Sequence, residues 1–257
     1  MKKTLLATAL FAGLAITGTA NAYQAEVGGG YSYLDPDNGS GVSQFGVNGT
    51  YYFNPVQIRN SPLAEAAFLD KASNVSGKAN YGDNSGTKNS TYGIAGEYYI
   101  PNSEFYVGAG VARNEYEVKR ANIDQKTTLY NAEVGYLPAP GLLVAVGVQG
   151  YDTKNGGDGA DPTLRAKLIT QLGTHDVNLE ARGVFGSDEN KQYYVGGDYY
   201  IDKTFSVGAD YTKDKSIDQD QWGLKAKKFI QPNLSVDGRV GFGDDYNTYT
   251  VGASYRF

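Results

Sequence analysis

Apolar and polar residues alternate along most of the chain, and the last nine residues show the pattern clearly. Tyr249, Val251, Ala253, Tyr255 and Phe257 are separated by Thr, Gly, Ser and Arg. Successive side chains of an extended strand point to opposite faces, so this period of two predicts a strand with one apolar face. The same reading predicts about fourteen strands, with roughly twelve to sixteen left open. They fall near 23–33, 41–53, 73–81, 88–100, 104–117, 125–137, 142–152, 162–172, 175–186, 190–201, 204–213, 219–230, 234–243 and 246–257.

The two faces of the predicted strands differ in chemistry. One face is aliphatic and aromatic, as in Val144, Val146 and Val148, while the other mixes Gly, Ser, Thr and Asn with charged residues. An unpaired charge is costly to bury, so the charged face must meet water or opposite charges. The predicted pore-lining charges are Glu26, Lys78, Glu97, Glu133, Arg165, Lys167, Glu180, Arg182, Asp198, Asp210, Lys225, Lys227, Asp237, Arg239 and Arg256. The pattern predicts an all-β, antiparallel transmembrane β-barrel with a lipid-facing exterior.

A soluble secreted β-sandwich or a lipocalin-like barrel is the main alternative fold. It would place the aliphatic face inside and the charged face outside. Many glycines, including Gly28, Gly108 and Gly208, share the charged face, where small side chains leave room in a lumen. This placement favours the membrane barrel.

Turn sequences of two kinds separate the strands. Short turns at 101–103, 138–141, 173–174, 202–203 and 232–233 alternate with longer polar loops at 35–39, 82–86, 154–159 and 216–220. An even number of strands puts both chain ends on the periplasmic side, next to the short turns. The longer loops then face the cell exterior.

The N-terminus has the three parts of a secretory signal peptide. Lys2 and Lys3 precede an apolar run from Leu5, and the small-residue stretch that ends at Ala22 offers a cleavage site. A short membrane anchor is disfavoured because the run is shorter than the ~20 residues that span a bilayer. We expect a signal peptide at 1–22, a barrel at 23–257, and a location in the outer membrane of a Gram-negative bacterium.

Composition and charge narrow the function. Loss of Lys2 and Lys3 takes the 23 basic residues to 21 against 28 acidic ones, a net charge of −7, which argues against a nucleic-acid partner. There is no Cys, so no disulfide framework supports the fold. Tyr occurs 22 times and suits the two membrane interfaces, where a ring contacts lipid and its hydroxyl contacts water.

The segment from Asn54 to Ala72 breaks the alternation on the periplasmic side. Ser61 is expected to cap a short helix, with Pro62 in its first turn. Two interpretations stay open, a locally packed turn and a small plug or gate at the lower mouth. The residues of the candidate gate are Pro62, Leu63, Glu65, Phe68 and Leu69.

This region also carries a family resemblance. The stretch Tyr51-Tyr52-Phe53, the run from Pro62 to Leu69 and the stretch from Ala72 to Val75 resemble the porin family of Acinetobacter outer-membrane proteins (the carbapenem-associated porin type). The resemblance implies a channel for small hydrophilic solutes, with members implicated in carbapenem entry. It also implies gating by loops folded over the pore, and here the chain departs because its exterior loops are short.

Groups for enzymatic chemistry are scarce. The single His, His175, falls in a predicted periplasmic turn, so a Ser, His and acid constellation is not expected. The stretch from Asn155 to Asp161 resembles one copy of a calcium-binding Gly/Asp repeat, and such repeats bind as stacked arrays. We expect no enzyme, no metal and no cofactor.

The resulting functional prediction is passive diffusion through a water-filled barrel. Basic residues on the later strands, opposite Glu97 and Glu133, would create a transverse field that orients polar solutes. The terminal Phe257 resembles the signature by which the barrel assembly machinery recognises outer-membrane barrels. The alternative is a plugged structural or adhesive barrel, embedded in outer-membrane lipid, that binds a partner through its exterior loops.

Overall fold

The computed structural model describes residues 22–84, 86–118, 122–186 and 191–257; the predicted signal peptide, up to Asn21, lies outside them. The described residues form fourteen strands. They are β1 (Ala22–Pro36), β2 (Val42–Gln57), β3 (Asn74–Asn84), β4 (Thr87–Tyr99), β5 (Phe105–Val118), β6 (Ile123–Ala139), β7 (Leu142–Thr153), β8 (Asp158–Leu172), β9 (His175–Phe185), β10 (Lys191–Asp202), β11 (Phe205–Asp214), β12 (Gln219–Gln231), β13 (Leu234–Gly243) and β14 (Tyr246–Arg256).

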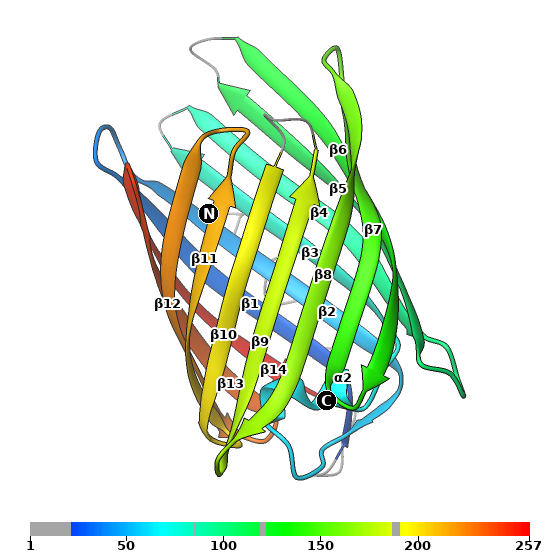
Figure 1. Ribbon diagram of the computed structural model, residues 1–257. Helices are drawn as coiled ribbons and strands as arrows, with labels where there is room; N and C mark the ends of the chain where they lie inside the picture. The colour runs from blue at the N-terminus through cyan, green and yellow to red at the C-terminus, as the bar shows by residue number, and fades with distance from the viewer. Residues whose placement is uncertain (1–21, 85, 119–121, 187–190) are drawn as a thin grey trace.

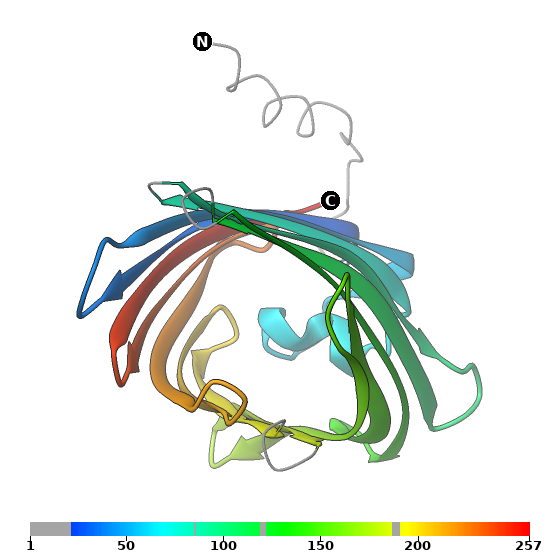
Figure 2. The same cartoon turned by 90° about the horizontal axis from the view of Figure 1, so that it is seen from above.

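Each strand pairs antiparallel with the next, and β1 pairs with β14 to close the barrel (Figures 1 and 2). The closing seam runs from Glu26 opposite Arg256 to Pro36 opposite Tyr246. Closure pairs the edges of the sheet with each other, which a spanning sheet requires in lipid. The predicted all-β antiparallel barrel of about fourteen strands is confirmed.

The strand β8 begins four residues earlier than predicted. It begins at Asp158 and not near 162, and Pro162 lies within it. Among the described residues, the part of β8 that precedes Thr163 pairs with β7 and not with β9. The missing N–H of Pro162 therefore costs no hydrogen bond to β9. Proline is tolerated there because that side of the strand is an edge.

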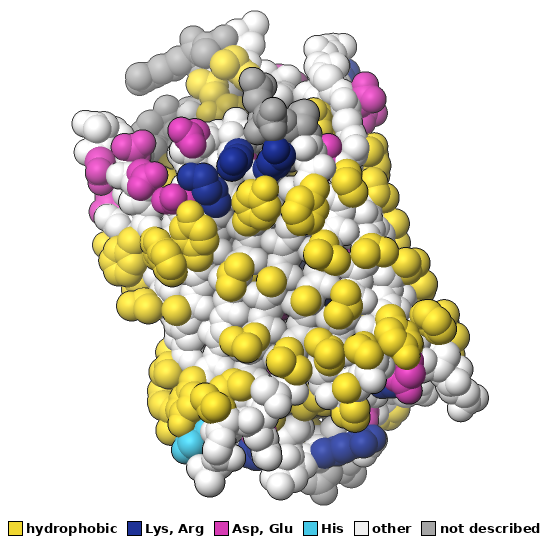
Figure 3. All heavy atoms as spheres, viewed as in Figure 1, with side chains coloured by type: hydrophobic (Ala, Val, Ile, Leu, Met, Phe, Trp, Pro, Cys, Tyr) yellow, Lys and Arg dark blue, Asp and Glu magenta, His cyan; other side chains and the backbone are white. Residues whose placement is uncertain are grey.

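On the face that Figure 3 shows, apolar side chains form a band across the outside of the barrel. Ile94, Trp222 and Leu224 are each at least 60% exposed when no lipid surrounds the barrel. This exposure is expected for side chains that contact lipid in the membrane. Aromatic pairs such as Tyr211 with Trp222, whose ring centroids lie 4.6 Å apart, reinforce the band. Among the described residues, no helix has the length and apolar character needed to cross a bilayer.

One segment departs from the sheet, the β2–β3 insert (residues 58–73). It contains a 3₁₀ turn, η1 (Leu63–Glu65), and one helical turn, α2 (Ala66–Leu69). Seen along the barrel axis, it lies inside the ring of strands (Figure 2). The expected cap was wrong, because Pro62 occupies the N-cap position and no side chain caps the turn. The proline backbone starts the turn without help from Ser61.

Candidate functional site: the lumen and its insert

Several of the predicted pore-lining charges meet one another in ion pairs. Arg165 lies at the centre of one cluster, with Nη1 3.1 Å from Glu133 Oε1 and Nε 3.3 Å from Glu180 Oε1. Glu97 approaches the same guanidinium at 4.0 Å. The hydroxyl of Tyr106 lies 2.9 Å from Glu133 and 3.1 Å from Glu97. One cation and a phenol therefore hold three carboxylates together.

Further ion pairs lie along β10 to β13. Lys225 Nζ is 2.9 Å from Asp198 Oδ2, and Arg239 Nη2 is 2.5 Å from Asp210 Oδ1. The expected separation of basic and acidic walls is wrong in these regions. The long side chains of Lys225 and Arg239 reach carboxylates two strands away. These basic residues therefore pair with acids on the same wall and not with acids on the opposite wall.

Arg256 links the closing seam to the insert. Its Nε lies 2.5 Å from Glu26 Oε2, and its Nη1 donates to the carbonyl oxygen of Leu63 at 2.9 Å. The guanidinium also lies over two rings, 4.4 Å from the centroid of Tyr23 and 4.5 Å from that of Phe229. Stacking, pairing and hydrogen bonding all use the planar guanidinium, which a lysine could not reproduce.

A second set of contacts holds the insert from the opposite wall. Glu65 is 5% exposed; its Oε2 lies 2.8 Å from Lys167 Nζ, and its Oε1 accepts a hydrogen bond of 2.6 Å from Tyr200. The N–H of Leu63 donates to the carbonyl oxygen of Lys203 at 2.8 Å. These partners belong to β8, β10 and the turn after β10. The insert therefore crosses the lumen, and the interpretation as a locally packed turn is wrong.

Aromatic side chains complete this lower end. Tyr99, Tyr106, Leu137 and Leu143 form one buried cluster against Phe68 of the insert. A second cluster joins Tyr23, Tyr52, Val56 and Ala66. Of the other candidate gate residues, Pro62 and Leu63 are buried and Leu69 is half-buried.

These inward rings were not predicted, because tyrosines were expected only at the two membrane interfaces. The signal was available in the adjacent pairs Tyr51-Tyr52, Tyr98-Tyr99 and Tyr199-Tyr200. Neighbouring residues of a strand point to opposite faces, so one member of each pair must point inward.

The upper lumen is more open and its charges are less paired. None of the ion pairs found among the described residues uses Lys78, Arg182, Lys227 or Asp237. Arg182 donates from Nη2 to Gln149 at 2.8 Å, and Lys227 lies over the ring of Phe229 at 5.6 Å. Lys78 lines two hollows of the inner wall, of about 480 and 510 Å³.

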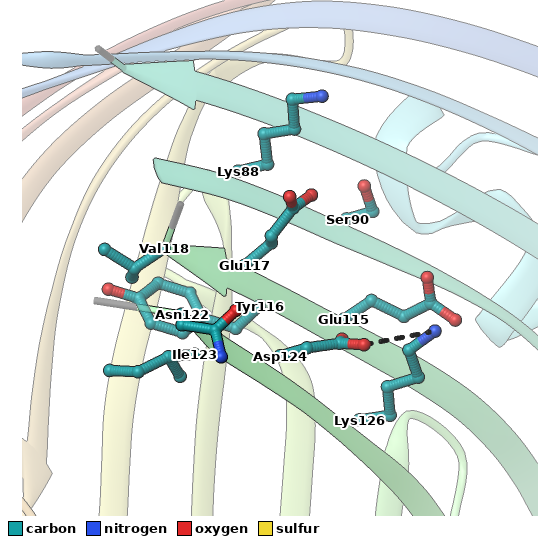
Figure 4. Close-up of a pocket in the computed structure, with 10 residues that line it drawn as sticks. All are labelled: Lys88, Ser90, Glu115, Tyr116, Glu117, Val118, Asn122, Ile123, Asp124 and Lys126. Carbon is teal, nitrogen blue, oxygen red and sulfur yellow. Dashed lines mark ion pairs between the residues drawn. The ribbon is translucent and has the colours of Figure 1, made fainter. Parts of the chain in front are cut away.

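A different pocket, of about 370 Å³, lies on the extracellular half of β4 to β6 (Figure 4). Its lining includes Lys88, Glu115 and Lys126, and the last is 3.9 Å from Asp124. Tyr92, an exposed lipid-side residue, donates to Glu115 at 3.3 Å, which places this pocket on the outer surface. Spanning a bilayer takes about 9–11 residues of a tilted strand, so strands of this length extend beyond the lipid with charged outer faces.

The closed barrel, its apolar band and its polar interior define an outer-membrane channel protein. A family model described as "Putative general bacterial porin" matches residues 1–165 and 162–257, and the chain belongs to this family. The protein is a channel of the bacterial outer membrane and not an enzyme. His175 has a structural neighbour, the carbonyl oxygen of Tyr200, 3.1 Å from its Nδ1.

Solved structures give two informative comparisons. The Acinetobacter baumannii outer membrane protein Omp33 is 30% identical, covers 93% of this chain and 100% of its own, and has a TM-score of 0.73. The CymD monoaromatic hydrocarbon channel is 10% identical, with 91% and 89% coverage and a TM-score of 0.60, so it shares the fold alone. No curated protein matches the chain by sequence.

Proposed function

We propose that the protein is a gated channel for passive diffusion of small hydrophilic solutes, with the β2–β3 insert as its periplasmic gate. The observation that carries the proposal is the way the insert is held. Glu65 and Leu63 are fixed by polar contacts to Lys167, Tyr200, Lys203 and Arg256. These polar contacts can be exchanged for water, so the insert can leave the lumen once the apolar contacts of Ala66 and Phe68 with the two aromatic clusters are also broken.

The solutes include carbapenem-type antibiotics in this proposal, on the basis of the family resemblance. A bore lined by charges, amides and hydroxyls admits polar molecules and disfavours apolar ones. Liposome swelling with sugars of increasing size, and then with a carbapenem, measures this range. Swelling with small sugars and none with the antibiotic would remove the antibiotic from the proposal.

The test of the gate is single-channel conductance of the refolded protein in a planar bilayer, in a salt gradient. The comparison variant replaces residues 58–72 with the short turn Pro-Asn-Ser, as in the natural turn at 101–103. We expect brief openings from the complete protein and a steady open level from the shortened variant. A shortened, folded barrel that stays silent would contradict the channel.

A plugged structural or adhesive barrel is the second candidate function. The locally paired charges around Arg165 and the docked insert favour it, since both fill the lower lumen. Under this alternative the complete and the shortened protein would both be silent, and binding to host or envelope surfaces would depend on the exterior loops.

We also propose that Phe257 is read by the barrel assembly machinery. Its N–H donates to the carbonyl oxygen of Ala25 at 2.8 Å, and its ring lies 4.9 Å from that of Tyr255. Phe257 directly follows β14 and hydrogen-bonds to β1 at the closing seam. Deletion of Phe257 should lower the amount of barrel in the outer membrane while refolding into detergent proceeds, and an unchanged amount in cells would contradict this role.

A further inference from the structure

The inner wall of β2 to β7 contains a hollow of about 480 Å³, here called the wall cup. Its floor is formed by small residues, Gly93, Ala95, Gly110 and Ala112. A Cβ on Gly93 would lie 2.7 Å from Ala112 Cβ, so a larger side chain cannot enter without displacement. The hollow therefore exists because four neighbouring inward positions carry almost no side chain.

Neutral hydrogen-bonding groups surround this floor. Asn48, Thr50 and Ser76 line one side, and Asn131 and Gln149 line the other. Amides and hydroxyls both donate and accept, so they match the hydroxyl or amide groups of a polar solute. A solute lying on the floor would find partners on both sides.

Two cations, Lys78 and Arg182, complete the lining, which contains no acidic residue. Arg182 uses one N–H on Gln149, at 2.8 Å, and a guanidinium has five. Two acids border the cup without lining it. Asp161 lies directly across from Gln149 on β8, and Asp237 shares the adjoining hollow with Lys78.

We propose that the wall cup binds small carboxylate-bearing solutes, such as sugar acids, as they enter from outside. The carboxylate pairs with Arg182 and Lys78, and the rest of the molecule bonds to the amide and hydroxyl rim. Charge-assisted bonds from a guanidinium to a carboxylate are about twice as strong as neutral ones, which gives acids an advantage over neutral polyols. The inference rests on the proposed channel function, because it names the solute class that the channel would take.

The test is a ligand-observed NMR titration of the purified, detergent-solubilised barrel at low salt, with gluconate and sorbitol as probes. These two polyols differ in one carboxylate. We expect gluconate to bind at least roughly tenfold more tightly, the effect of one hydrogen bond to a charged group. Arg182→Gln and Lys78→Gln should each remove most of this preference.

Lys227→Gln is the matched control. Lys227 is also an inward cation outside the described ion pairs, but it lies on β12, away from the wall cup. It should leave gluconate binding unchanged. Ala112→Leu, which fills the floor, should weaken gluconate and sorbitol alike, with folding checked by heat-modifiable migration on a gel.

Three results would overturn the wall cup: equal affinity for both probes, full gluconate binding in the double variant of Lys78 and Arg182, and an equal loss in Lys227→Gln. The last would assign the preference to the overall field of the lumen. The titration measures binding and not transport. A protein that is silent in a bilayer would therefore refute the proposed channel function without deciding whether the wall cup binds gluconate.

Discussion

The two ends of the lumen are built from the same alternating strands and differ in how they are filled. At the periplasmic end, Tyr106 and Leu143 are each 1% exposed. In the upper lumen, the inward side chain of Leu129 is 37% exposed. The alternation alone therefore does not decide whether an inward residue is buried. What decides it is the β2–β3 insert, which supplies the partner surface at one end only.

This difference suggests that stability and permeability are assigned to separate regions. The lower end has aromatic clusters and buried ion pairs, as in the core of a soluble domain. The upper wall has small residues, amides and exposed cations. Substitutions at the lower end should change the free energy of unfolding and the gate, while those above should change which solutes bind.

The largest effect is expected for Arg256→Met. It leaves Glu26 without its partner and removes the stacking on Tyr23 and Phe229 and the bond to Leu63. Breaking a buried ion pair by removing one partner costs about 3–5 kcal/mol. Urea titration in lipid vesicles, followed by the fluorescence of the single Trp222, measures the free energy of unfolding. The free energy of unfolding of Arg256→Lys should lie between those of the natural protein and Arg256→Met. An unchanged urea midpoint for Arg256→Met would contradict the role of Arg256 at the closing seam.

Glu65→Ala should open the gate with a smaller effect on the barrel. Loss of a buried partner at about 3–5 kcal/mol corresponds to a roughly hundredfold or larger fall in the ratio of docked to undocked insert. Open probability in a planar bilayer measures it. The control is Arg59→Ala, because the pair of Arg59 with Asp70 is exposed on the arginine side and such pairs contribute about 0–1 kcal/mol. Equal open probabilities for the two variants would show that Glu65 does not hold the insert.

Two leucines test the contrast between the ends directly. Leu143→Ala at the lower end should cost about 2–5 kcal/mol of unfolding free energy, because it leaves a cavity against Tyr99 and Tyr106. Leu129→Ala in the upper lumen should stay within about 0.5 kcal/mol, as for an exposed side chain. The same urea titration compares them, and similar losses at both sites would refute the difference in packing.

The smallest expected effect is on selectivity. Lys225→Glu with Lys227→Glu reverses two lumen charges near Asp198 and Asp237 and should raise the preference for cations over anions. The reversal potential of the variant with the shortened insert, in a salt gradient, measures this preference. If the reversal potential does not move, these lysines are not exposed to the permeating ions.

The strands could be predicted because lipid imposes a strict rule on every second residue. Val144, Val146 and Val148 were recognisable as lipid-facing for this reason, and all three are exposed. The barrel closure also followed, since a sheet in lipid cannot leave an open edge. The charged residues were predicted to point inward because they alternate with the apolar residues along each strand.

The partners of those residues could not be predicted, because they depend on register and on long-range contacts. Arg256 meets Glu26 across 230 positions of sequence, and Tyr200 meets Glu65 across 135. The inward tyrosines were missed for a related reason. A ring on the inner face is buried only where the insert covers it, and alternation carries no information about the insert.

The position of the anchors along the chain has a consequence for biogenesis. The polar partners of the insert all follow it in the sequence: Lys167, Tyr200, Lys203 and Arg256, the last on the closing strand β14. The insert cannot reach its final place until the last strand has arrived and joined the first. If the insert is the proposed gate, a nascent barrel completes its wall and its gate together, and the closed wall is not left as an open hole in the envelope.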